Sequence, residues 1–95
     1  MKHVAAVKHL REFFRRNGYV RRQNPIRVAE EGSQRYRKGE EVRLTASSSE
    51  ELRLIRRLLR QAGFTPGRPF VKGRQYRQPV YGRQEVARFL ELVAE

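Results

Sequence analysis

The sequence predicts a single α+β domain of the order αββαββα, in which an antiparallel sheet carries helices packed on one face. Three observations support this prediction. Apolar residues recur at helical spacing in three stretches of the 95-residue chain. Between those stretches they alternate with polar residues, as in strands that are half-buried. No linker or low-complexity segment divides the chain, whose length suits one domain over residues 1–95.

The first helix is predicted over residues 2–17, and Gly18 is expected to end it. Strand-like sequence follows from Tyr19, with alternation in "PIRVAE" (25–30) and "EVRLTA" (41–46). The polar residues between them predict either a hairpin with a long basic loop or longer strands that turn at Gly32. The apolar stripe of the first helix is formed by Val4, Val7, Leu10, Phe13 and Phe14.

The stretch "SSSEELRLIRRLLRQAG" (47–63) predicts the second helix, with Ser48 and Glu51 as a capping box and Gly63 as its end. A second hairpin is expected in residues 68–82, turning at Lys72–Gly73, and a final helix in residues 83–94. Solvent-exposed positions are assigned to Arg53, Arg56, Arg57 and Arg60. The buried stripe of the second helix is assigned to Leu52, Ile55, Leu58, Leu59 and Ala62, and the apolar face of the final helix to Val86, Phe89, Leu90 and Val93. The packing candidates of the second hairpin are Phe70, Tyr76, Val80 and Tyr81.

Charge is the main functional signal in the composition. The chain has 22 Lys and Arg against 10 acids, a net charge of +12, and every acid is Glu. Such an excess is typical of proteins that bind polyanions, most often nucleic acid. A GC-rich genome would explain why Arg is more frequent than Lys, but it would not explain why basic residues outnumber acidic ones. With no cysteine and no apolar run of membrane-spanning length, we expect a cytoplasmic protein that contacts no membrane.

The expected binding surface is the outward face of the sheet together with the basic loop. Phosphate contacts there would supply affinity, and any contacts to base edges would supply specificity. DNA is favoured over RNA as the partner. Tyr36 in the loop is the candidate for stacking on an unpaired base, whereas Tyr76 and Tyr81 are expected to pack. The candidate phosphate contacts are Arg21, Arg22, Arg27, Arg35, Arg37, Lys38, Arg43, Lys72, Arg74 and Arg77.

The stretch "LREFFRRNGY" (10–19) resembles the motif of the LAGLIDADG homing endonuclease family, and the predicted element order is similar to that family's domain. The stretches "LIRRLLRQAGF" (54–64) and "VARFLELV" (86–93) resemble its later helices. The resemblance implies a nucleic-acid-binding saddle of strands. The motif positions that fit the family are Leu10, Phe13, Phe14, Gly18 and Tyr19.

Two departures from the family pattern change what the resemblance implies. Asn17 stands where the family has its metal-holding acid, and Arg15 stands at the earlier acid. An amide offers Mg²⁺ no charge, so we expect no catalytic residue, metal or cofactor. Arg11 and Glu12 replace the small residues through which two such helices pack closely, so we expect a monomer or a weak homodimer.

Two alternatives remain open from the sequence. An active or partner-dependent endonuclease would take its metal ligands from Glu residues or from another chain. A small protein-interaction or ribonucleoprotein-docking module would use the basic charge to bind an acidic partner. His3 and His9 are six residues apart, a spacing that does not suit a shared metal on one helix.

Overall fold

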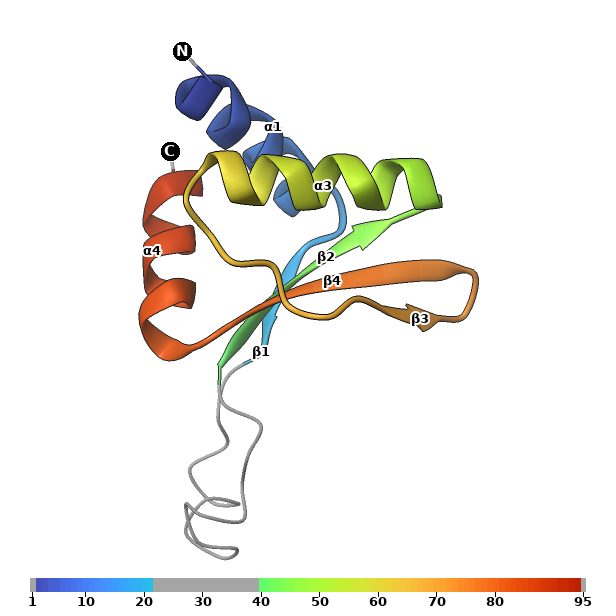
Figure 1. Cartoon of the computed structure of the whole chain (residues 1–95). Helices are drawn as coiled ribbons and strands as arrows, with labels where there is room; N and C mark the ends of the chain where they lie inside the picture. The colour runs from blue at the N-terminus through green and yellow to red at the C-terminus, as the bar shows by residue number, and fades with distance from the viewer. Residues whose placement is uncertain (1, 22–39, 95) are drawn as a thin grey trace, which may run out of the picture.

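The computed structural model of the protein describes residues 2–21 and 40–94, with only the backbone of Lys2 and His3. The strand expected in residues 25–30 and the basic loop lie outside these residues. The described chain confirms an α+β domain of order αββαββα (Figure 1). Its elements are α1 (Lys2–Asn17), β1 (Tyr19–Arg21), β2 (Glu41–Ala46), α3 (Ser49–Gln61), β3 (Phe70–Lys72), β4 (Gln75–Tyr81) and α4 (Arg83–Val93).

The four strands form one antiparallel sheet in the order β1-β2-β4-β3. The central pair is β2 and β4, which run side by side from Glu41 opposite Tyr81 to Ala46 opposite Tyr76. Helices α1 and α3 lie over one face of this sheet, and α4 stands beside them (Figure 1). The hairpin of β3 and β4 turns at Gly73, whose φ of 64° is the left-handed conformation that glycine tolerates.

The core lies between the helices and that face of the sheet. Val42, Leu44 and Ala46 alternate along β2 and are each fully buried, because every second side chain of a strand points to the same side. Phe89 of α4 fills the centre, with the rings of Phe14 and Phe64 packed edge-on at centroid distances of 5.6 and 5.5 Å. The helices add Leu52, Ile55, Leu58, Leu59, Val86 and Val93, as the helical spacing predicts.

In α1 the buried positions differ from the predicted stripe. Ala6 and Leu10 are buried and Phe14 packs against the core, whereas Val4 is 65% exposed. Val4 is two positions before Ala6 and therefore about 200° around the helix from the buried side. The assignment of Val4 to the apolar stripe was wrong for this reason.

Gly18 follows α1 as predicted, but its role is spatial. Its φ is not positive, unlike that of Gly63, which is 88° where α3 ends. A Cβ on Gly18 would lie 2.6 to 2.9 Å from atoms of Phe14, whose carbonyl accepts the Gly18 N–H. The chain therefore needs glycine here in order to turn tightly from α1 into β1.

The N-terminus of α3 carries half of the predicted capping box. Ser48 Oγ accepts the N–H of Glu51 at 3.1 Å, as expected. The Glu51 carboxylate accepts the N–H of Ser47 at 3.1 Å, one residue before the cap. Arg16 of α1 also binds this carboxylate, so one acid serves both the cap and the contact between two helices.

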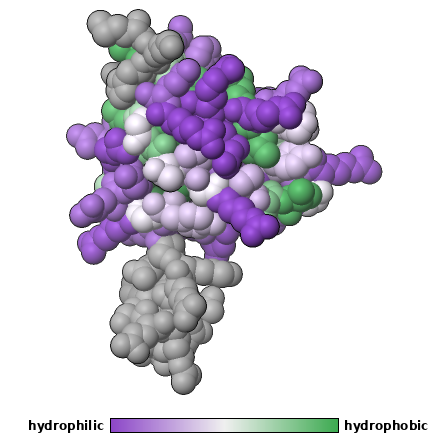
Figure 2. All heavy atoms as spheres, in the orientation of Figure 1, coloured by the Kyte–Doolittle hydropathy of each residue, from purple (hydrophilic) through white to green (hydrophobic). Residues whose placement is uncertain are grey.

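Arg56 is an exception to the predicted exposed side of α3. Arg53, Arg57 and Arg60 are exposed, and Figure 2 shows a largely hydrophilic surface on the face where α3 lies. Arg56 is half-buried and donates to Gln78 Oε1 at 2.7 Å and to the Gly67 carbonyl at 2.9 Å. Because Gln78 is a fully buried polar residue of β4, the fold requires a partner for it, and Arg56 provides one.

Candidate nucleic-acid interface

The side chains that alternate with the core residues of the strands define the other side of the sheet, which we call the far face. Cross-strand partners share a face, so the register assigns each residue. The far face carries four cations against one acid. Its residues are Tyr19, Arg21, Glu41, Arg43, Thr45, Phe70, Lys72, Gln75, Arg77, Pro79 and Tyr81.

Arg43 lies on this face, as the alternation of "EVRLTA" predicts, but it is already engaged. Its guanidinium donates to both carboxylate oxygens of Glu41, from Nε at 3.0 Å and from Nη2 at 3.1 Å. Only 12% of the Arg43 side chain is exposed, and only 5% of the Glu41 side chain. Burial lowers the pKa of Arg43, but hydrogen bonds with Glu41 and Tyr19 outweigh it and hold the pKa above its ordinary value. Arg43 is therefore a charged, paired group that organises its neighbours.

Tyr19 and Phe70 lie against the same guanidinium. Arg43 Nη1 donates to the Tyr19 hydroxyl at 3.2 Å, and the Arg43 Cζ lies 4.9 Å from the Phe70 ring centroid. Burial raises the pKa of Tyr19, but hydrogen bonds from Arg43 and Arg77 and the charge of Lys72 bring the pKa below its ordinary value. The phenol oxygen thus lies in a positive field, which also favours an anion.

Arg77 continues this network into β4. Its Nη1 donates to Gln75 Oε1 at 3.0 Å. Its Nε is buried and has no hydrogen-bond partner within the part of the chain that the structure describes. Arg77 is half-buried, so of the predicted contacts it and Arg43 are the less accessible to a phosphate.

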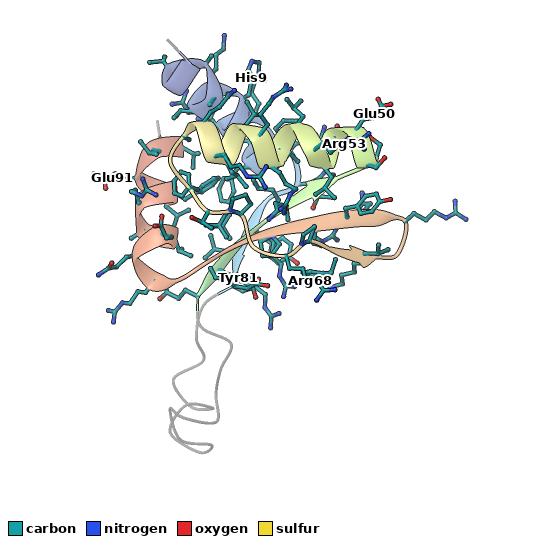
Figure 3. The ribbon with its side chains drawn as sticks, in the orientation of Figure 1. His9, Glu50, Arg53, Arg68, Tyr81 and Glu91 are labelled. Atoms are coloured by element: carbon teal, nitrogen blue, oxygen red, sulfur yellow. The ribbon has the colours of Figure 1, made fainter. Side chains whose placement is uncertain are left out.

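The accessible cations lie around this network. Lys72 and Arg74 are exposed at the β3–β4 turn. The Arg21 side chain is 39% exposed, and its Nη1 lies 3.9 Å from Glu41 Oε1. Arg68, which the sequence did not single out, is exposed on the same side of the sheet (Figure 3). The remaining candidates, Arg22, Arg27, Arg35, Tyr36, Arg37 and Lys38, lie outside the described residues.

Tyr81 was expected to pack, and this was wrong. Tyr81 is 53% exposed, and Figure 3 shows it on the side of the sheet away from the helices. Tyr76, the other tyrosine assigned to packing, is half-buried against the core as expected. The two differ because Tyr76 lies opposite Ala46 in the register, whereas Tyr81 lies opposite Glu41 on the far face.

Residues of the motif that resembles the endonuclease family hold the junction between α1 and β1. Leu10 is buried, and Phe13 and Phe14 are half-buried in helix contacts. Asn17 is exposed, and its carbonyl accepts the Thr45 hydroxyl at 3.1 Å. Arg11, at a position where that family has a small residue, donates from Nε to the Val93 carbonyl at 3.3 Å. Among residues 2–21 and 40–94, no group of three or more His, Cys, Asp or Glu is placed to hold a metal.

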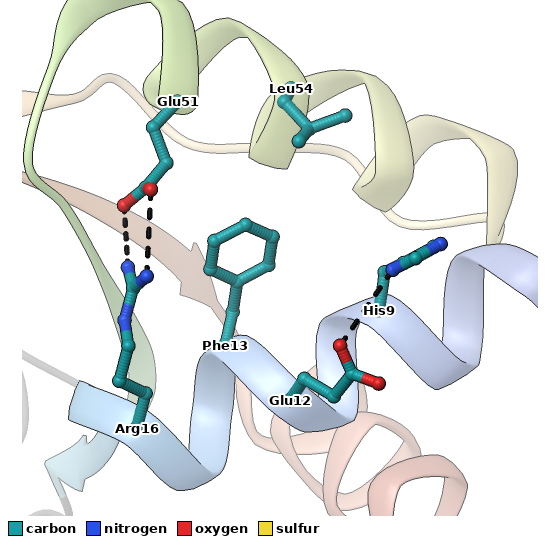
Figure 4. Close-up of a pocket in the computed structure, with 6 residues that line it drawn as sticks. All are labelled: His9, Glu12, Phe13, Arg16, Glu51 and Leu54. Atoms are coloured by element: carbon teal, nitrogen blue, oxygen red, sulfur yellow. Dashed lines mark hydrogen bonds and ion pairs between the residues drawn. The ribbon is translucent and has the colours of Figure 1, made fainter.

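A hollow of about 310 Å³ lies between α1 and α3, on the opposite side of the sheet from the far face (Figure 4). Its apolar floor is Phe13 and Leu54, both half-buried. The Arg16–Glu51 ion pair bounds one end, and at the other His9 Nδ1 lies 3.9 Å from Glu12 Oε2. Hydrogen bonds from Arg16 hold the pKa of Glu51 below its usual value.

Comparison with known proteins gave no relative: no family model, no curated protein and no solved structure matches the chain. The helices that the structure describes include none with the length and apolarity needed to span a bilayer.

Proposed function

We propose that the chain is a non-catalytic nucleic-acid-binding protein, with DNA favoured over RNA. The far face and the basic loop would contact the phosphate backbone. The supporting observation is the accumulation of cations on one face of the sheet, where the one acid among the described strand residues, Glu41, is already bound to Arg43. Exposed groups at Arg21, Lys72 and Arg74 would contact phosphates, while Arg43 and Arg77 hold the surface in shape.

The test compares charge reversal on two surfaces of the same protein. The double variant Arg21→Glu, Lys72→Glu changes the far face, and the control Arg53→Glu, Arg57→Glu makes the same change in net charge on α3. Binding to a DNA duplex is measured across a salt series. We expect the far-face variant to bind about tenfold or more weakly. The slope of log K against log salt should become shallower by about 0.9 for each duplex phosphate that the variant no longer binds. Equal effects in both variants would mean that only overall charge matters.

The hollow between α1 and α3 favours a second candidate, a protein-interaction module. Half-buried Phe13 and Leu54, bordered by one ion pair and by polar side chains, are suited to an apolar side chain of a partner. This function predicts a complex that persists after nuclease treatment and is abolished in Leu54→Asp.

The endonuclease alternative predicts strand nicking that requires a divalent cation and stops with a chelator.

A further inference from the structure

Tyr81 is an aromatic side chain that the fold exposes at a fixed place. It ends β4 directly after Gln78, Pro79 and Val80, all of which are buried. Its ring lies against Gly67, since a Cβ there would come within 2.4 Å of the ring. Gly67 is itself held by its N–H, which donates to the Pro79 carbonyl at 2.9 Å. The ring is therefore seated against backbone while the residue remains 53% exposed.

Cations flank this ring in both directions across the sheet. Arg21 pairs with Glu41 and Glu41 with Tyr81, which places Arg21 two strands away, at about 10 Å in strand spacing. On the other side the exposed Arg68 follows Gly67 in the chain (Figure 3). A single strand offers matching groups, because a flat base can stack on the ring while the phosphates on either side of that nucleotide bind the two cations.

Other planar groups extend the same surface. The Arg43 Cζ lies 4.9 Å from the Phe70 ring centroid and 6.0 Å from that of Tyr19. Both rings are half-buried, and their positions are fixed by contacts with a paired guanidinium. Unpaired bases stack on aromatic rings, so the half-buried rings of Tyr19 and Phe70 offer a continuation beyond Tyr81.

We propose that the far face binds single-stranded nucleic acid, with an unpaired base stacked on Tyr81 and neighbouring phosphates on Arg21 and Arg68. The inference rests on the proposed function and narrows it from nucleic acid in general to strands with unpaired bases. In a duplex, neighbouring base pairs cover both faces of each internal base, so the Tyr81 ring has no base to stack on. The single strand is therefore the ligand that uses both the ring and the cations.

The experiment separates bases from phosphates. Labelled strands of about 16 nucleotides are used as oligo-dT, oligo-rU, an abasic strand with the same number of phosphates, and a duplex. We expect oligo-dT or oligo-rU to bind roughly 5- to 150-fold more tightly than the abasic strand. Tyr81→Ala should remove this difference and leave the salt dependence unchanged. The tighter of the two oligonucleotides identifies DNA or RNA.

A second variant reports stacking directly. The chain has no Trp, so Tyr81→Trp introduces a single indole at the proposed platform. Its fluorescence should be quenched by the strands with bases and not by the abasic strand. The control for the Tyr81→Ala binding measurements is Val71→Ala. It alters a residue that is 66% exposed on the neighbouring strand but belongs to the opposite face. This control should bind every strand as the parent protein does.

The outcomes distinguish the two proposals. If strands with and without bases bind equally, and Tyr81→Ala changes nothing, the stacking inference is wrong and the proposed function stands. Preference for duplex over both single strands also overturns the inference alone. If no strand binds in a salt-dependent manner, both proposals are wrong.

Discussion

Strand β2 has two sides that are buried by different chemistry. On the helix side Val42, Leu44 and Ala46 are fully buried among apolar side chains of the three helices. On the far face Glu41 and Thr45 are each 3% exposed, almost as little. There the Arg43 guanidinium is hydrogen-bonded to the Glu41 carboxylate and to the Tyr19 phenol, and the Phe70 ring lies against it. One side gains stability by removing apolar surface from water, the other by satisfying charges that burial would otherwise penalise.

This difference determines what each side can do. An apolar core excludes water and is fixed by shape, so its surface offers nothing to a charged ligand. The far face keeps a net positive charge after Glu41 is paired with Arg43, and its planar groups are held in place. Such a layer is both stable and able to bind an anion. Substitutions made on one side only test whether the two sides of the sheet contribute to stability independently.

The largest expected effect is on the helix side. Phe89→Ala would remove a fully buried ring that packs edge-on against Phe14 and Phe64. We expect the free energy of unfolding to fall by about 3–5 kcal/mol, measured by urea denaturation. Leu92→Ala, a partly buried residue on the same helix, is the control and should cost clearly less. A loss below about 1 kcal/mol for Phe89→Ala would contradict the assigned core.

The next effect is on the far face. Glu41→Gln would leave Arg43 charged, 12% exposed and without its carboxylate, and we expect a loss of about 3 kcal/mol in urea denaturation. Replacing both partners, Glu41→Leu with Arg43→Met, should restore most of that stability because no unpaired charge remains. A double variant no more stable than the single one would mean that Glu41 acts through other contacts than Arg43.

The helix side was the more predictable of the two. Helical and strand periodicities are local, so Leu52, Ile55 and Phe89 could be assigned to the core from spacing alone. Local spacing failed at Arg56, which is drawn inward by buried Gln78, a residue far from it in the sequence. Tyr81 is a different case. It directly follows buried Val80, so strand alternation already places it on the opposite face, and the assignment of both residues to packing missed that signal.

The far face could be predicted in part. Alternation assigned Arg43 to the outward side, and the same alternation places Glu41 two positions earlier on that side, a signal for their ion pair that was available. The contacts of Tyr19 and Phe70 with Arg43 depend on which strands are neighbours. That order is a property of the whole fold, so no spacing in the sequence specifies it.

The smallest effect compares the buried pair with an exposed one. Arg16 and Glu51 are 45% and 21% exposed, so water screens their attraction, and Glu51→Gln should cost about 1 kcal/mol at neutral pH. Hydrogen bonds from Arg16 hold the pKa of Glu51 below its ordinary value of 4.5. A carboxylate with a depressed pKa stabilises the fold above the unfolded value and loses that contribution as pH falls through the folded one.

The stability difference between the parent protein and Glu51→Gln should therefore be constant near neutrality and shrink as pH falls below 4.5. Urea denaturation at a series of pH values measures it, with Glu91→Gln, an exposed position on α4, as the control. A difference that stays constant to low pH would show that the neutral amide disrupts the helix cap rather than an ion pair. The N–H of Ser47 donates to the Glu51 carboxylate, and the amide oxygen of Gln could accept the same N–H. We therefore expect the lost charge to account for most of the loss of stability.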